Sequence, residues 1–236
     1  MKPHHWLSLC AVLALTSATA AARDPSFVSA AQSGSGLILA TPPANDSDVT
    51  RRELAELHSL EASRSEQQSA QAIWDDNNEH IFIYKTVFGD GFNAEKLPTV
   101  AAFGKRVRND EGINSDVPKQ AFHRQRPYNL DKTLKPICAT KVIDDSYPSG
   151  HATSGYLLAL AVIDLVPERR DDILARAENY AFNRLICGVH YRSDVEASKL
   201  LAFTVHAIMK QNPQYQLEMA AALNHPLIFK PPRTSD

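Results

Sequence analysis

The sequence predicts an all-α protein that folds as a single domain. Apolar side chains recur at helical intervals in several segments, whereas strand signals are weak and no internal repeat is present. The 236 residues are enough for one large domain. A content of 44% hydrophobic and 22% charged residues is typical of globular proteins and excludes a wholly disordered chain.

Residues 1–22 have the pattern of a cleaved secretory signal peptide. Lys2 supplies a basic start, residues 6–14 are mostly apolar, and Ala20-Ala21-Ala22 or Ala18-Thr19-Ala20 fits the small-residue cleavage rule. The alternative is a membrane anchor, but the apolar run is shorter than the roughly 20 residues that span a bilayer. We therefore expect export to the periplasm or secretion. No later segment predicts stable membrane insertion, because the best apolar run, 157–166, is short and contains Asp164.

Cys138 and Cys187 remain after removal of the leader, since Cys10 lies inside it and too early for a lipoprotein site. Two cysteines in an exported chain predict one disulfide. Two buried free thiols are the alternative, because sequence alone does not show that the two residues approach each other.

The first half of the mature chain contains one clear helical pattern. Residues 23–47 are rich in Ser, Ala, Gly and Pro and predict a flexible lead-in. Thr50 and Glu53 have capping-box spacing, and the apolar repeat that follows predicts a helix to about Trp74. A further apolar patch spans residues 81–88. The polar stretch 107–117 predicts a loop.

We expect the main domain to span residues 48–225. The second half of the chain predicts five helices. Pro118 suits a first helical position, and Pro127 should end that helix at about Gln125. Residues 127–148 contain three prolines and predict a long loop, a kind of segment that is often functional. The other predicted helices span about 151–165, 169–185, 193–210 and 214–223, and an irregular tail follows at 226–236.

Lys119 and Arg126 form the first candidate binding pair. They are seven residues apart, so on a helix both would lie on one face. Two such cations suit a phosphate, because Arg offers a planar fork and Lys a point charge. A solvated basic face is the commoner outcome, so this pair alone decides nothing.

Ser149-Gly150-His151 precedes a predicted helix and forms the second candidate. A Ser-Gly turn at a helix start presents backbone N–H groups and a hydroxyl to an anion, and His151 would lie beside it. A plain helix cap and a surface histidine are the alternative interpretation.

Arg184, His190 and Asp194 form the third candidate. A carboxylate that accepts from one imidazole nitrogen fixes the tautomer and leaves the other nitrogen as a nucleophile. Asp194 follows His190 by four residues, which permits this contact, although Asp194 could also simply start a helix. Together the three segments supply three cations, an anion-binding turn and two histidines, a set that suits phosphoryl transfer without a metal.

The ten residues of Lys119-x6-Arg126-Pro127, Pro148-Ser149-Gly150-His151 and Arg184-x5-His190-x3-Asp194 resemble the three-part signature of the type 2 phosphatidic acid phosphatase superfamily. The chain is most similar to its bacterial class A non-specific acid phosphatases. The resemblance implies a helical bundle with the active site among facing helices. It implies His190 as the nucleophile, Asp194 as its orienting partner and His151 as the general acid. The implied phosphate cradle comprises Lys119, Arg126, Ser149, Gly150 and Arg184.

Two residues depart from the family pattern. Asn183 stands where a Ser usually precedes Arg184, and Asp145 stands where class A enzymes have a Gly. We expect the larger Asn183 to alter a phosphate contact and Asp145 to repel anionic substrates.

The sequence thus predicts an exported, metal-independent acid phosphatase that hydrolyses phosphomonoesters through a phosphohistidine and needs no cofactor. The alternatives are a vanadium-dependent haloperoxidase and a phosphate-binding protein that has lost catalysis. The net charge of −2 argues against a general nucleic-acid binder. The physiological substrate, phosphotransfer instead of hydrolysis, and a homo-oligomeric state stay open.

Overall fold

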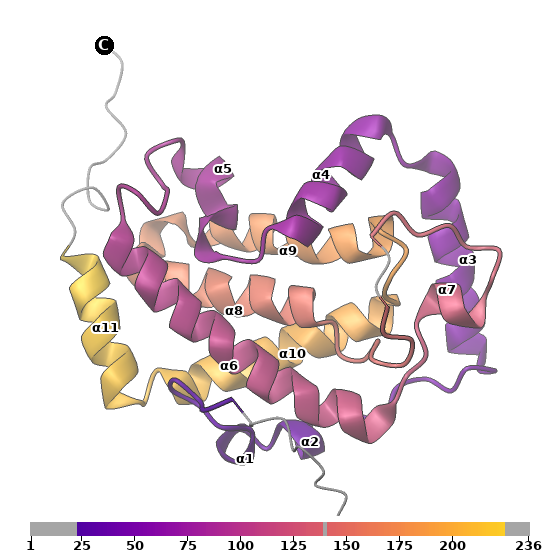
Figure 1. The fold of residues 1–236 in the computed structure, drawn as a ribbon, viewed down its shortest axis with the longest axis horizontal. Helices are drawn as coiled ribbons and strands as arrows, with labels where there is room; N and C mark the ends of the chain where they lie inside the picture. Colours follow the sequence, from indigo (N-terminus) through magenta and orange to yellow (C-terminus); the bar gives the residue numbers. More distant parts are fainter. Residues whose placement is uncertain (1–22, 139–140, 225–236) are drawn as a thin grey trace, which may run out of the picture.

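The computed structural model describes residues 23–138 and 141–224, and within them every regular element is a helix. This confirms the all-α prediction. α8 (Gly150–Leu165) lies at the centre, with α6, α9 and α10 packed around it (Figure 1). The remaining helices are α1 (Ala30–Ser33), α2 (Ser35–Ile38), α3 (Asp48–Ser63), α4 (Glu66–Asn77), the 3₁₀ helix Ile81–Tyr84, α5 (Lys85–Phe88), α6 (Pro98–Phe122), α7 (Pro127–Leu130), the 3₁₀ helix Pro167–Arg169, α9 (Arg170–Ile186), α10 (Arg192–Met209) and α11 (Pro213–Leu223).

α8 is buried on nearly all sides, as expected for an apolar helix at the middle of a bundle. Its start positions Ser149, Gly150 and His151, and its end precedes Pro167, as the sequence predicts. The boundaries of α9, α10 and α11 also lie within one or two residues of those predicted. None of the described helices has the length and apolar character needed to cross a membrane.

The helix predicted from Thr50 to about Trp74 is two helices in the structure. Ser47, not Thr50, caps α3, because its Oγ accepts from the Thr50 N–H at 3.2 Å. Ser65 forms a capping box with Gln68 and starts α4. The Ser65 and Gln68 side chains each satisfy one free N–H group at the new helix start, which favours the break at this point.

Residues 107–117, predicted as a loop, lie inside α6, the longest of the described helices. The buried face of α6 begins with apolar residues such as Val100 and Phe103 and continues with Asp110, Glu111 and Asn114. Because hydrophobic periodicity counts only apolar positions, a buried polar face escapes it. The predicted helix start at Pro118 is wrong for the same reason, because Pro118 lies within α6.

The segment 23–47, expected to be a flexible lead-in, packs against the bundle. Phe27 and Val28 are buried, and their backbone N–H groups each donate to Asp110 Oδ2 at 2.7 Å. This carboxylate satisfies backbone donors that a packed irregular segment would otherwise leave unpaired. The leader at 1–22 and the tail from residue 225 lie outside the described residues, as do the predictions made for them.

Cys138 and Cys187 form a disulfide with a Cα–Cα separation of 5.2 Å, as predicted. It ties the segment after α7 to the end of α9. Because α9 carries Arg184 and His190 follows it, the bridge fixes the backbone beside these two residues.

Replacement of both cysteines, Cys138→Ser with Cys187→Ser, is expected to lower the free energy of unfolding by about 2–4 kcal/mol. The bridge closes a loop over a sequence separation of 49 residues and so restricts the unfolded chain. Urea unfolding with and without a reductant checks this. The reductant should destabilise the wild type and leave the double variant unchanged; equal stability of the oxidised wild type and the double variant would contradict it.

Candidate active site

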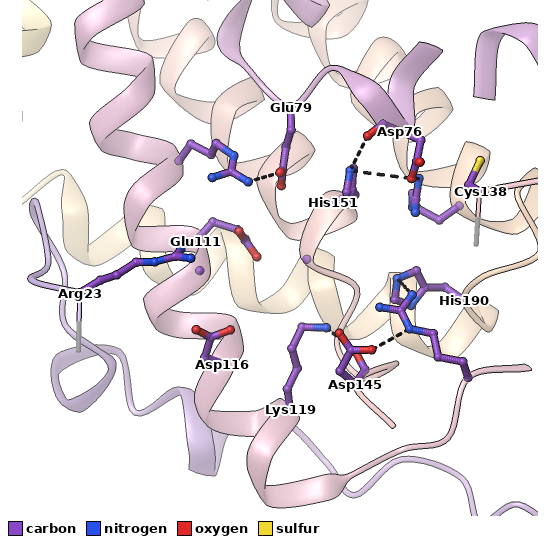
Figure 2. A pocket seen from close by; sticks show the side chains of 15 residues that line it. Arg23, Asp76, Glu79, Glu111, Asp116, Lys119, Cys138, Asp145, His151 and His190 are labelled. Atoms are coloured by element: carbon purple, nitrogen blue, oxygen red, sulfur yellow. Dashed lines mark hydrogen bonds and ion pairs between the residues drawn. The ribbon is translucent and has the colours of Figure 1, made fainter. Parts of the chain in front are cut away.

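The three predicted segments meet at a polar cavity of about 440 Å³ (Figure 2). The cavity lies between the C-terminal part of α6, the N-terminus of α8 and the turn after α9. Ser149 and Asp194 do not line it, whereas the other predicted site residues do. These lining residues are Lys119, Arg126, Gly150, His151, Arg184 and His190.

Lys119 and Arg126 reach the cavity from different elements. α6 ends at Phe122, where His123 adopts a left-handed conformation with φ of 46°, so the expectation that one helix face carries both cations is wrong. Lys119 lies in the last turn of α6, and Arg126 is delivered by the segment that precedes α7. The fold thus brings the pair together by a chain turn instead of helical spacing.

Asp145 holds both of these cations. Its Oδ1 accepts from Arg126 Nε at 2.8 Å, and its backbone oxygen accepts from Lys119 Nζ. The carboxylate lines the cavity, so it lies where a charge that repels anionic substrates would have to be. The structure adds a second role, since Asp145 also positions Arg126.

The N-terminus of α8 forms another wall of the cavity. Ser149 is its N-cap and accepts from the Ala152 N–H at 3.3 Å, and Gly150 and His151 are its first two residues. The first turn of a helix carries unpaired N–H groups and a partial positive charge, both of which favour an anion.

His190 projects into the cavity from the turn after α9. Gly188 makes this turn with φ of 72°, a conformation that disfavours other residues. Nδ1 of His190 lies 2.8 Å from the backbone oxygen of Ser146 and 3.3 Å from Asp194 Oδ2. Because a carbonyl oxygen only accepts, Nδ1 carries the hydrogen. Arg126 Nη1 lies 2.9 Å from Nε2, and because a guanidinium only donates, Nε2 has the lone pair that accepts.

The environment keeps this imidazole uncharged. Burial and the neighbouring Arg126, Lys119 and Arg184 cations hold the pKa of His190 well below its usual value. Its Nε2 lone pair is consequently retained under acidic conditions, in which a solvent-exposed histidine would be protonated.

Asp194 is surrounded by hydrogen-bond donors. Its carboxylate accepts from Arg124 Nη1 at 2.6 Å, Ser146 Oγ at 2.6 Å and the Tyr191 N–H at 2.9 Å, in addition to its contact with His190. This set fixes the carboxylate behind the histidine, so the predicted contact between Asp194 and His190 is present in the structure.

Arg124 is a residue that the sequence reasoning missed. It is buried, bridges Asp194 to Glu53 Oε2 at 3.1 Å, and stacks 4.0 Å over the Tyr191 ring. Arg124 lies in the basic segment 119–126, which was the available signal. Nothing in the sequence of that segment distinguishes an arginine that lines the cavity from one that is buried behind it.

His151 and Arg184 share Asp76, a second residue that was not predicted. His151 Nε2 donates to the Asp76 backbone oxygen at 3.0 Å, and Arg184 Nη1 donates to Asp76 Oδ1 at 2.7 Å. Burial and the Arg184 charge lower the pKa of His151 to about 4. An anion in the cavity would oppose the effect of the Arg184 charge and favour the imidazolium.

Arg184 retains an unused donor. Its Nε is buried and has no hydrogen-bond partner among the described residues. A buried N–H without a partner is unfavourable, and an anion in the cavity that Arg184 lines would satisfy it.

Asn183 does not line the cavity. Its side-chain nitrogen donates to Asp75 Oδ2 at 2.6 Å, and the same carboxylate pairs with Arg176. The departure from the family pattern at position 183 therefore belongs to a buried network behind the site, contrary to the expected change in a phosphate contact.

The arrangement can bind a tetrahedral anion against three cations and a helix N-terminus. Metal ligation has weaker support within residues 23–138 and 141–224. There, the acidic and sulfur atoms that lie close enough to share a metal are those of Asp76, Cys138 and Cys187, and the disulfide removes both thiolates.

Comparisons with known proteins agree with this architecture. Residues 110–218 match the PAP2 superfamily model. An acid phosphatase of Zymomonas mobilis is 28% identical over 79% of this chain and 73% of its own length. A non-specific acid phosphatase of Salmonella typhimurium is 28% identical over 77% of this chain and 76% of its own.

Solved structures share the fold, and one of them is a vanadium-dependent enzyme. The chain superposes on a bacterial vanadium-dependent iodoperoxidase with a TM-score of 0.56 and 16% identity, over 78% of this chain. This chain spans about half of that protein, or 53% of its length, and the likeness concerns the fold alone.

Proposed function

The chain belongs to the PAP2 superfamily, and from that premise we propose that it is an acid phosphatase that hydrolyses phosphomonoesters through a phosphohistidine. The observation that carries the proposal is the uncharged His190, whose Nε2 lone pair faces a cavity lined by Lys119, Arg126 and Arg184. A nucleophile and an anion-binding cradle therefore occupy the same space.

The cradle would hold the phosphate by charge-assisted hydrogen bonds. Arg126, Arg184 and Lys119 supply cationic donors, and the first turn of α8, which starts at Gly150 and is capped by Ser149, supplies backbone N–H groups. The charge that develops on the transferred phosphoryl group is neutralised by these side chains, so the mechanism requires no metal ion and no other cofactor. Arg126 would turn from His190 Nε2 to the phosphate and leave the lone pair free.

His190 would attack first. Its Nε2 forms a bond to phosphorus while the bond from phosphorus to the ester oxygen breaks, and Asp194 and the Ser146 carbonyl stabilise the positive charge that develops on the ring. Asp194 thus acts as an orienting partner that does not touch the substrate.

His151 would exchange the proton. Because its Nε2 is held by the Asp76 carbonyl, Nδ1 is the nitrogen that gives the proton to the departing alcohol. In the second step, water attacks phosphorus, Nδ1 takes a proton from that water, and the bond between phosphorus and His190 breaks. The bound phosphate dianion supplies the field that raises the pKa of His151 enough for this role.

Export is part of the proposal. The disulfide between Cys138 and Cys187 is typical of an oxidising compartment, in agreement with a cleaved leader and a periplasmic or secreted enzyme. We also propose that residues 48–225 contain the complete active site, with phosphomonoester small molecules as substrates.

Hydrolysis of p-nitrophenyl phosphate at about pH 5–6, in excess EDTA, tests the function. We expect turnover that EDTA does not reduce. Phosphate binding without turnover would instead support a lapsed binding protein. Peroxide-dependent halide oxidation, found only after vanadate loading, would support a haloperoxidase.

A further inference from the structure

Glu111 is a buried carboxyl group in the cavity that the mechanism above does not use. Its exposed fraction is 5%, and it lines the cavity from α6 (Figure 2). The lining carboxylates of Asp76, Glu79 and Asp145 each pair with an arginine. Glu111 forms no ion pair with any described residue. Its Oε1 accepts a hydrogen bond from Ser115 Oγ at 2.6 Å.

The carboxyl group of Glu111 lies beside the N-terminus of α8, next to the proposed phosphate position. A Cβ atom built on Gly150 would be 3.2 Å from Glu111 Oε1 and 4.0 Å from Lys119 Cε. Gly150 is the first residue of α8, so Glu111, Lys119 and the N-terminus of α8 share one corner of the cavity. A phosphate held by Lys119 and the N-terminus of α8 would therefore contact Glu111.

The surroundings favour the protonated acid. Glu79 faces Glu111 from the segment before the 3₁₀ helix Ile81–Tyr84, while Arg108 and Lys119 face it from α6 itself. His151 on α8, Arg23 from the N-terminal segment and the exposed Asp116 line the same cavity. Burial, reinforced by Glu79, raises the pKa of Glu111 to about 8 against the opposing effect of Lys119.

We propose that Glu111 is a further phosphate-binding residue, whose protonated carboxyl group donates a hydrogen bond to a phosphate oxygen and whose ionised form competes with the phosphate for Lys119. The inference rests on the proposed function and deepens it. It makes the affinity for the phosphoryl group, and not only proton transfer by His151, a source of the preference for acidic conditions. Ionisation replaces a donor by a negative charge beside a dianion, which opposes binding.

Glu111→Gln tests this, because the amide keeps the size and a hydrogen-bond donor but never ionises. The kcat/KM of p-nitrophenyl phosphate is measured for both proteins from about pH 5 to about pH 9. The variant-to-wild-type ratio should be close to one at about pH 5. It should rise to about tenfold at about pH 9, since one unit above the pKa leaves about one molecule in ten protonated. The competitive inhibition constant of inorganic phosphate should show the same trend, as a binding role requires.

Asp116→Asn is the matched control, because it removes an exposed carboxylate from the same helix and the same cavity. Its ratio to the wild type should not vary with pH. A variant-to-wild-type ratio of kcat/KM for Glu111→Gln that does not change with pH, or one far below one at about pH 5, would overturn the inference. Activity of the wild type in the same assay would still uphold the proposed function. If the wild type has no activity, calorimetric binding of inorganic phosphate by the same proteins gives the same comparison.

Thermal unfolding without substrate gives an independent measurement. The pKa of Glu111 is raised on folding from 4.5 to about 8, so the folded state binds the extra proton between these values. The stability from this proton is complete below about pH 4.5 and is lost as the pH rises to about 8. The melting temperature of Glu111→Gln minus that of the wild type should therefore increase across this window, while that of Asp116→Asn should not. A constant difference for Glu111→Gln would contradict a protonated Glu111.

Discussion

His190→Ala is expected to reduce kcat/KM for p-nitrophenyl phosphate by at least about a thousandfold. The change removes the Nε2 lone pair that faces the cavity, and with it the covalent step. The cradle of Lys119, Arg126 and Arg184 stays, so inorganic phosphate should still bind. Steady-state kinetics at about pH 5–6 and phosphate binding by calorimetry check the two parts of this prediction.

His58→Ala is the control for the loss of a histidine as such. His58 also pairs with a carboxylate, since its Nε2 lies 2.9 Å from Asp131 Oδ2, but it does not line the cavity. We expect nearly unchanged kinetics. Residual activity of His190→Ala within about tenfold of the wild type would contradict its assignment as the nucleophile.

Arg124→Gln is expected to lower the free energy of unfolding by about 3–5 kcal/mol. The guanidinium lies between the carboxylates of Glu53 and Asp194, and all three groups are buried. Removal of the cation leaves two carboxylates without their common partner, and the large energetic effect comes from this uncompensated burial. Because Asp194 contacts His190, activity should fall in the protein that remains folded.

Arg192→Gln provides the matched comparison. Arg192 pairs with Glu56, but the side chains of this pair are 42% and 33% exposed. Water screens such a pair, so the expected loss is less than about 1 kcal/mol. Urea unfolding of both variants measures the difference. Equal losses of the free energy of unfolding in the two variants would contradict the larger contribution expected from the buried Arg124 network.

The predictable part of the fold is the part with an apolar core face. α8 is apolar nearly throughout, and α9 to α11 repeat apolar residues at helical intervals, so local pattern and tertiary packing agree. α6 was missed because Asp110, Glu111 and Asn114 occupy its buried face. Their burial depends on partners distant in sequence, such as the backbone of Phe27 and Val28, which no local pattern contains.

The residues of the candidate site also divide into those that the sequence predicted and those that it did not. Short signatures identified six of the residues that line the cavity, and the structure brings Lys119, His151 and His190 among them together from three elements. The groups that hold these residues in place were not predictable. Arg124 and Asp76 act through hydrogen bonds across 70 and 108 residues of sequence, to Asp194 and Arg184 respectively. Lys119 and Arg126 line one cavity, but the helical spacing that predicted their proximity is not the reason, because α6 ends before Arg126.

The most direct test of the account is detection of the phosphoryl group on His190. His151→Ala should slow attack by water more than formation of the intermediate from p-nitrophenyl phosphate, whose leaving group needs little protonation. The reaction is stopped under alkaline denaturing conditions, in excess EDTA, and the peptides are analysed by mass spectrometry. The account predicts one phosphoryl group on the peptide that contains His190, and none when His190→Ala is added. Turnover with no phosphorylated residue, or with the phosphoryl group on another residue, would contradict it.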